Sequence, residues 1–258
     1  MPAHAVDLPR ALPLLLPLLL VASGATAGES SDAHLDPRIP RLVAALDTAE
    51  VDVTATRLLK AATRSGGHAA WLRARTERHG ADVRIDVLEE HGSGRTRKRV
   101  LHGVLDAERE SDRQRRSAIT SANYDFRIEQ EGPDGYAVRL LPKRRDTRLV
   151  DGVIWVDADG HPRRLQGRLA KSPSFWVRSV TILTTYDQVN GVTLPVSVET
   201  LADVRFIGLS VFSMRYTYES VDRDAVRSAV RAADAGPEPA TPSPTILALH
   251  AAWKSGTR

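Results

Sequence analysis

Residues 176–218, which contain the clearest fold signal, read WVRSVTILTTYDQVNGVTLPVSVETLADVRFIGLSVFSMRYTY. Apolar side chains occupy alternate positions through most of this stretch, and Asn190-Gly191 separates two alternating runs. A period of two indicates a strand with one buried and one wet face. Because Asn-Gly readily supplies the positive φ of a tight turn, the stretch predicts antiparallel hairpins.

The same alternation continues toward the N-terminus in residues 83–87, 124–129 and 136–140. Turn residues rich in Gly, Asp and Pro separate the runs at 79–82, 91–94, 132–135 and 158–160. Successive hairpins predict a meander in which each strand pairs with the one before it. No helical segment is left between residues 155 and 218 for a crossover, which excludes parallel βαβ units there.

The segments around the meander have other patterns. Residues 41–64 carry apolar side chains at near-helical spacing before Ser65-Gly66-Gly67, so we expect one bent or two short helices packing on the sheet. Residues 106–116 are nearly all charged, which predicts a solvated loop or a short exposed helix. Residues 223–258 are rich in Ala and Pro and predict a flexible tail, whose apolar patch either docks or is disordered. That patch is Ile246, Leu247, Leu249 and Trp253.

The N-terminus has the order of a secretory signal peptide. Arg10 precedes the apolar run ALPLLLPLLLV at residues 11–21, and Ala25-Thr26-Ala27 forms an A-x-A pattern before Gly28. The run is shorter than a spanning helix and holds two prolines, which also disfavour a buried core helix. We therefore expect residues 1–27 to be removed after Ala27, leaving a soluble periplasmic protein with a domain over 28–222.

Composition removes several classes of function. The chain of 258 residues is 42% hydrophobic and 26% charged, which is enough apolar surface for a packed core. It has no cysteine, which excludes disulfides, thiolate metal sites, cysteine nucleophiles and an acylated lipoprotein cysteine. The scattered histidines show no metal-binding spacing, so we predict no metal and no cofactor. Asp157-Ala158-Asp159-Gly160 opens like a calcium loop but lacks the closing Glu, and a hairpin turn is the better interpretation.

Two basic runs, at residues 95–99 and 143–145, require a separate interpretation. Nucleic-acid binding would place such charge beside stacking aromatics, whereas here the aromatics alternate onto the dry face, so we predict no nucleic-acid partner. The formal net charge is only +4. The two interpretations left open are solvated strand edges and a docking patch for anionic lipid head groups. Gly92-Ser93-Gly94 is not expected to hold phosphate, because a strand is predicted after it.

Residues 124–222 resemble a known family through the order of their elements. These are Leu140-Leu141-Pro142-Lys143, the run Gly152-Val153-Ile154-Trp155-Val156-Asp157, and Asn190-Gly191-Val192-Thr193-Leu194-Pro195. The succession resembles the periplasmic lipoprotein-sorting carriers of the LolA/LolB type. The resemblance implies a mostly β (α+β) fold, a curved antiparallel half-open β-barrel with the N-terminal helix packing on its concave face. It also implies an apolar cavity that holds acyl chains.

Three hypotheses follow. The first is a carrier or chaperone that shields lipid or lipoprotein acyl chains and exchanges them with membrane-associated donor and acceptor proteins. The second is a non-enzymatic periplasmic scaffold or envelope-sensing domain whose groove is filled by its own helix. The third is a hydrolase with carboxylates clustered on the concave face. As the wall of the cavity or simply as core we select the following inward positions: Trp155, Trp176, Val180, Ile182, Tyr186, Val198, Phe206, Phe212, Met214 and Tyr216.

Overall fold

The computed structural model describes residues 36–48, 51–64, 68–79, 82–109, 118–222 and 241–254. The predicted signal peptide lies outside the described residues, as does the second half of the charged segment at 110–117. None of the helices in these ranges is long and apolar enough to cross a membrane.

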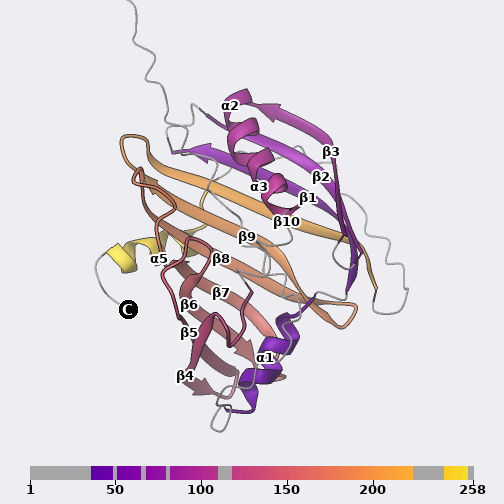
Figure 1. Ribbon diagram of the computed structural model, residues 1–258, viewed down its shortest axis with the longest axis vertical. Coiled ribbons are helices and arrows are strands. Elements are labelled where there is room, and N and C mark those ends of the chain that lie inside the picture. Colours follow the sequence, from indigo (N-terminus) through magenta and orange to yellow (C-terminus); the bar gives the residue numbers. More distant parts are fainter. Residues whose placement is uncertain are drawn as a thin grey trace, which may run out of the picture.

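Ten antiparallel strands form one sheet in the order β3-β2-β1-β10-β9-β8-β7-β6-β5-β4 (Figure 1). Consecutive strands from β4 to β10 are neighbours, which confirms the predicted meander. The first strand also pairs with the last, with Leu59 opposite Met214. The sheet does not close, because β3 and β4 remain its edges. The strands are β1 (Asp52–Thr63), β2 (Ala70–His79), β3 (Asp82–Gly92), β4 (Tyr124–Gly132), β5 (Gly135–Pro142), β6 (Val150–Asp157), β7 (Pro162–Leu169), β8 (Val177–Val189), β9 (Val192–Val204) and β10 (Gly208–Asp222).

The helix expected over residues 41–64 is wrong beyond its first part. A helix, α1 (Arg38–Leu46), is followed by β1, whose residues alternate between buried and half-buried. Alanine is a strong helix former and is depleted in strands, so the local preference of this segment favours a helix. Pairing of β1 with β2 on one side and β10 on the other outweighs that local preference.

A second helical segment was missed. Residues 94–108 form α2 (Gly94–Thr96), η2 (Arg97–Leu101) and α3 (His102–Glu108), which run on without a break. The strand expected after Gly94 is therefore absent. The first part of the charged segment has the helical one of its two predicted structures, but Ala107 and Glu108 are buried rather than exposed. The basic residues lie at the start of this helix, while its later apolar residues are buried. We call residues 94–108 the helical cover.

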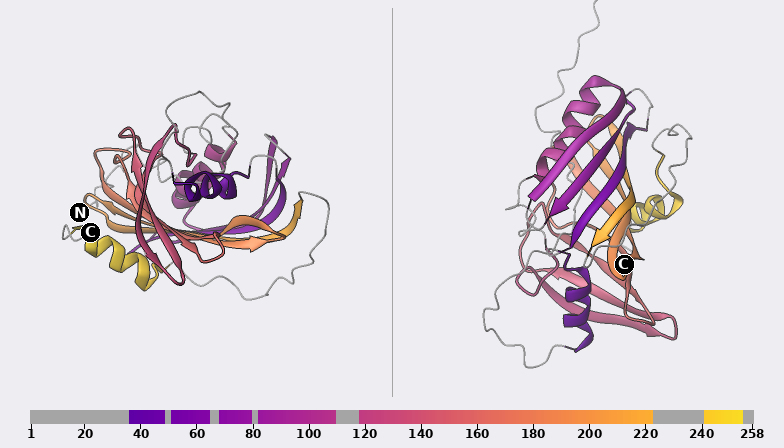
Figure 2. Two further views of the ribbon diagram at one scale, coloured as in Figure 1. Left: turned by 90° about the horizontal axis from the view of Figure 1, so that it is seen from below. Right: turned by 90° about the vertical axis from the view of Figure 1, so that its right-hand side faces the viewer.

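Both α1 and the helical cover pack on the same face of the sheet, inside its curve (Figure 2). The buried residues of α1 join a cluster that includes Ala202 of β9, and the cover joins a second cluster that includes Val198 of the same strand. Even-numbered residues of β9 share a face, so one concave surface carries both clusters. From the helices come Ile39, Leu42 and Leu46 in the first cluster and Val100, Leu101, Val104 and Leu105 in the second.

The opposite, convex face carries the helix α5 (Pro244–Lys254) (Figure 2). Its Ile246 packs against Leu201 and Val211, which point away from the concave side. Ser243 caps the helix by accepting a hydrogen bond from the Ile246 N–H at 3.3 Å. The sequence left open whether the C-terminal apolar patch docks or is disordered. In the structure, the patch forms α5 and docks on the sheet.

Candidate functional site

The concave face brings together seven of the ten residues selected from the sequence. Three of them lie in the cluster beneath α1, namely Val180, Ile182 and Tyr186, all of them buried. Four lie in or against the cluster beneath the helical cover, namely Val198, Phe212, Met214 and Tyr216. These seven residues therefore fall in two apolar clusters on the concave face, each beneath its own helix.

The other three selected residues lie elsewhere. Trp155 lies on the opposite face of β6 from the buried Ile154 and Val156, and its ring is 5.7 Å from the guanidinium of Arg164. Trp176 and Phe206 lie at one end of the sheet, before β8 and after β9, where their ring centroids are 5.9 Å apart. Strand parity failed for these two because both residues belong to turns.

The helical cover is joined to the sheet by a buried ion pair. Arg57 of β1 points into the concave face, and its Nη1 donates a hydrogen bond to Glu108 Oε2 at 2.5 Å. Both side chains are almost fully buried. Burial raises the pKa of the Glu108 carboxyl, and the positive charge of Arg57 opposes that rise. Tyr216 lies beside the pair, and burial raises the pKa of its hydroxyl well above the usual value.

Arg57 and Glu108 were missed by the sequence analysis, although the sequence contained a signal. In β1 the inward positions are Val53, Ala55, Arg57, Leu59 and Ala61, so a single charge interrupts an apolar stripe. A charge at such a position requires a buried partner, because an isolated one is strongly disfavoured. A helical interpretation of this segment conceals the signal, because the stripe exists only at a period of two.

The cluster beneath α1 is apolar apart from tyrosine hydroxyls. Tyr124 accepts a hydrogen bond from the Val150 N–H at 3.0 Å, and burial raises its pKa to about 12. Tyr186 is also buried, its hydroxyl has no hydrogen-bond partner, and its pKa is raised by the same cause. In the described part of the chain, the buried carboxylates are Glu108 and Asp203, and Asp203 lies on the convex side beside Lys254. Glu108 is therefore the buried carboxylate of the concave face among the described residues.

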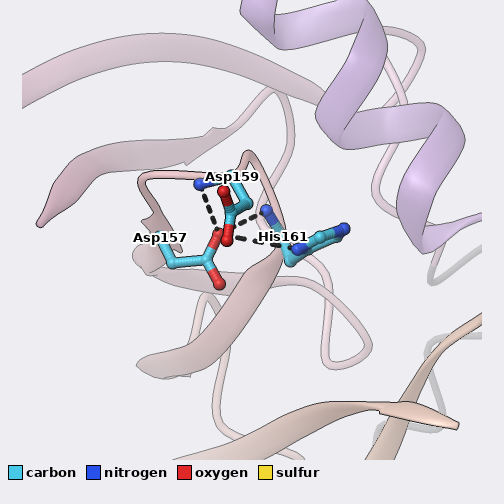
Figure 3. A group of neighbouring side chains, drawn as sticks. All are labelled: Asp157, Asp159 and His161. Atoms are coloured by element: carbon cyan, nitrogen blue, oxygen red, sulfur yellow. Dashed lines mark hydrogen bonds and ion pairs between the residues drawn. The ribbon is translucent and has the colours of Figure 1, made fainter. Parts of the chain in front are cut away.

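Three possible metal ligands do lie close together, at the β6–β7 turn (Figure 3). Asp157, Asp159 and His161 bring their ligand atoms within 4.8 Å of one another. Asp157 Oδ1 accepts hydrogen bonds from the N–H groups of Asp159 and His161, and Oδ2 accepts one from Arg163. This arrangement is an Asx turn with an ion pair, which accounts for the aspartates as hairpin residues.

No protein-family model matches the chain, and no curated protein matches it. Several solved structures are similar to it. A DUF1329 family protein from Desulfovibrio piger is 12% identical, with a TM-score of 0.36, over 74% of this chain and 92% of its own. A LolA superfamily protein from Nitrosomonas europaea is 10% identical, with a TM-score of 0.32, over 65% and 84%. An outer membrane lipoprotein-sorting protein domain from Vibrio parahaemolyticus is 9% identical, with a TM-score of 0.30, over 73% and 95%.

By their names, two of these neighbours belong to the LolA superfamily or to the outer membrane lipoprotein-sorting proteins. At such low identity and structural overlap, the likeness concerns the arrangement of strands and carries no assignment of ligand.

Proposed function

We propose that this protein is an exported, non-enzymatic carrier that shields the acyl chains of a lipid or lipoprotein during outer-membrane lipoprotein sorting. One observation carries the proposal: the concave face holds two apolar clusters, and each is covered by a short helix rather than by a second sheet. A second sheet would lock such a face permanently, whereas a short helix can move aside and be replaced by hydrocarbon. The signal-peptide pattern of residues 1–27 supports a periplasmic location.

The energetics favour a binding function. Removing hydrocarbon from water stabilises the bound state by about 0.8 kcal/mol for each CH2 group, so a long acyl chain repays the displacement of a helix that buries four apolar side chains. Those side chains belong to the helical cover. The ion pair between Arg57 and Glu108 fixes the position of the helical cover on the sheet, because either charge would be unpaired if the cover packed elsewhere.

The test is binding of a fluorescent 16-carbon fatty acid and of a diacylated cysteine peptide, together with native mass spectrometry of the purified protein. Phe212→Ala enlarges the face beneath the cover, and Val211→Ala removes an adjacent buried side chain on the convex face as the matched control. We expect the first variant to change the acyl affinity several-fold and the second to leave it unchanged. A wild-type protein that neither carries nor binds either probe would rule the carrier function out.

The alternative is a periplasmic scaffold or sensing domain whose concave face is permanently filled by its own helices. It is favoured by the close packing of the helical cover on the sheet, since Leu101, Val104 and Leu105 are all buried. In that case both variants lower the free energy of unfolding, and neither affects an acyl probe. The same pair of variants therefore separates the two functions.

A further inference from the structure

Three loops lie next to one another at one end of the sheet, and two of them carry exposed aromatic rings. These loops are residues 143–149, 170–176 and 205–207, and we call them together the aromatic rim. Adjacent hydrogen bonds join them: Ala170 N–H donates to the Leu149 carbonyl at 2.8 Å, and Arg205 N–H donates to the Trp176 carbonyl at 2.7 Å. The rim therefore forms one surface at the ends of β5–β10 (Figure 1).

Two of the aromatic rings of this surface are exposed to solvent. Phe206 is 92% exposed and Phe175 is 72% exposed, and the ring of half-buried Trp176 contacts both, at 5.9 and 5.6 Å between centroids. Water-exposed rings are unfavourable, and large exposed apolar groups that lie together mark interaction sites. These three come from two loops that are about 30 residues apart in the chain, so the grouping is a product of the fold.

Phe206 is also held in a costly backbone conformation. Its φ is +67°, in the left-handed region that a bulky side chain rarely adopts. The conformation places the ring at the tip of the β9–β10 turn, where it has no core contact to compensate for the strain. Such strain persists where the surroundings impose it, and it is concentrated at functional sites.

The charge around the rings is positive. The aromatic rim holds six Lys or Arg residues and one acidic residue, Asp146. Arg205 lies over the Phe175 ring, with its guanidinium carbon 4.5 Å from the centroid, while Lys171 and Arg145 are exposed. At the opposite rim, the described turns hold Asp134 and Asp159 and no Lys or Arg. The sheet is therefore polarised along its strands.

We propose that the aromatic rim docks this protein onto an anionic phospholipid bilayer. Aromatic rings prefer the interfacial layer of a bilayer, and clustered basic side chains are attracted to anionic head groups. A protein partner fits less well, because the rim presents two exposed rings and separate basic side chains on loop tips rather than the packed core of a protein interface. The proposal does not depend on whether the concave face binds acyl chains.

The test is co-sedimentation with vesicles of phosphatidylcholine alone and of phosphatidylcholine with one quarter phosphatidylglycerol, at low and high salt. Wild-type protein should bind the anionic vesicles more than tenfold more tightly than the neutral ones, and salt should reduce this preference. Phe175→Ser/Phe206→Ser should lower binding at least tenfold, and Lys171→Glu/Arg145→Glu should remove the preference for anionic vesicles. Leu88→Ser, at an exposed apolar residue of the edge strand β3, is the matched control and should bind as wild type.

A second readout reports on the rim itself. Brominated lipids should quench the fluorescence of Trp176 on binding, and Trp176→Phe should remove that quenching while the protein still sediments. Equal vesicle binding by the double serine variant and by Leu88→Ser would overturn the proposal, as would binding without preference for anionic vesicles. If the rim variants lost binding to a protein partner but still bound vesicles as the wild type does, the proposal would also be overturned. Acyl-probe binding in the absence of vesicles should be the same in all rim variants, so failure here and failure of the carrier function are distinguishable.

Discussion

The buried pair between Arg57 and Glu108 makes the sharpest prediction about how the helical cover is held. At the observed 2.5 Å and an effective dielectric constant of about 20, the attraction between the two charges is about 7 kcal/mol. Desolvation of the two ions cancels much of it, at several kcal/mol each. Removing one partner leaves the other charge buried and uncompensated. We therefore expect Glu108→Gln or Arg57→Met to lower the free energy of unfolding by about 3–5 kcal/mol.

The double variant Arg57→Met/Glu108→Leu should behave differently, because it leaves no buried charge. We expect it to be close to wild type in stability, or more stable by about 1–4 kcal/mol. The assay is urea unfolding followed by circular dichroism, with the thermal midpoint as a second measure that falls by about 2–4 °C per kcal/mol in a chain of this size. The control is Arg84→Met, which removes an exposed ion pair with Asp86 and should cost less than about 1 kcal/mol.

Two results would refute this reasoning. The first is a single variant that loses no more stability than the Arg84→Met control, which would mean that water reaches the pair. The second is a double variant whose loss equals the sum of the two single losses, because independent sites add and coupled charges do not. In either case, the ion pair would not be what holds the helical cover on the sheet.

Three further predictions concern other parts of the molecule. Phe206→Gly should keep or raise the free energy of unfolding, by up to about 1 kcal/mol, since a left-handed φ is costly for all residues but glycine; a clear loss in urea unfolding would contradict this. His250 lies 3.0 Å from the Thr181 hydroxyl, and burial lowers the pKa of its imidazole. Docking of α5 should therefore be complete above pH 6.5, the ordinary pKa, and should weaken as the pH falls through the lower pKa of the folded state. Hydrogen exchange of α5, corrected for pH, should then accelerate in acid, and His250→Gln should lose this dependence. Tyr124→Phe should cost about 1–3 kcal/mol in urea unfolding because it leaves the Val150 N–H buried and unpaired, and a neutral effect would show that water replaces the hydroxyl.

The charges that face His250 come from two elements. Asp203 of β9 favours the protonated imidazole, while Lys254 of α5 disfavours it. Desolvation is the largest cause of the lowered pKa, so the neutral imidazole is the form that fits the docked helix. The C-terminal helix is therefore expected to be the part of the molecule that loosens first in acid.

The candidate site divides into a part that local pattern could predict and a part that it could not. Phe212 and Met214 were located on the concave face because alternation along β10 follows from strand geometry alone. Trp176 and Phe206 were misplaced because strand parity does not extend into turns. Glu108 was taken for a solvated charge, since nothing in its neighbourhood along the chain reveals that Arg57 lies opposite.

The meander follows from local sequence pattern alone. Each hairpin joins neighbouring segments, and its turn chemistry and alternation are written within about 20 residues, so local physics is enough to specify it. Three features depend on tertiary contacts: β1 pairs with β10, Glu108 of the helical cover pairs with Arg57, and the ring of Trp176 contacts that of Phe206. These contacts join residues far apart in the chain. Their energy is gained only when the whole sheet has formed, and no local pattern records it.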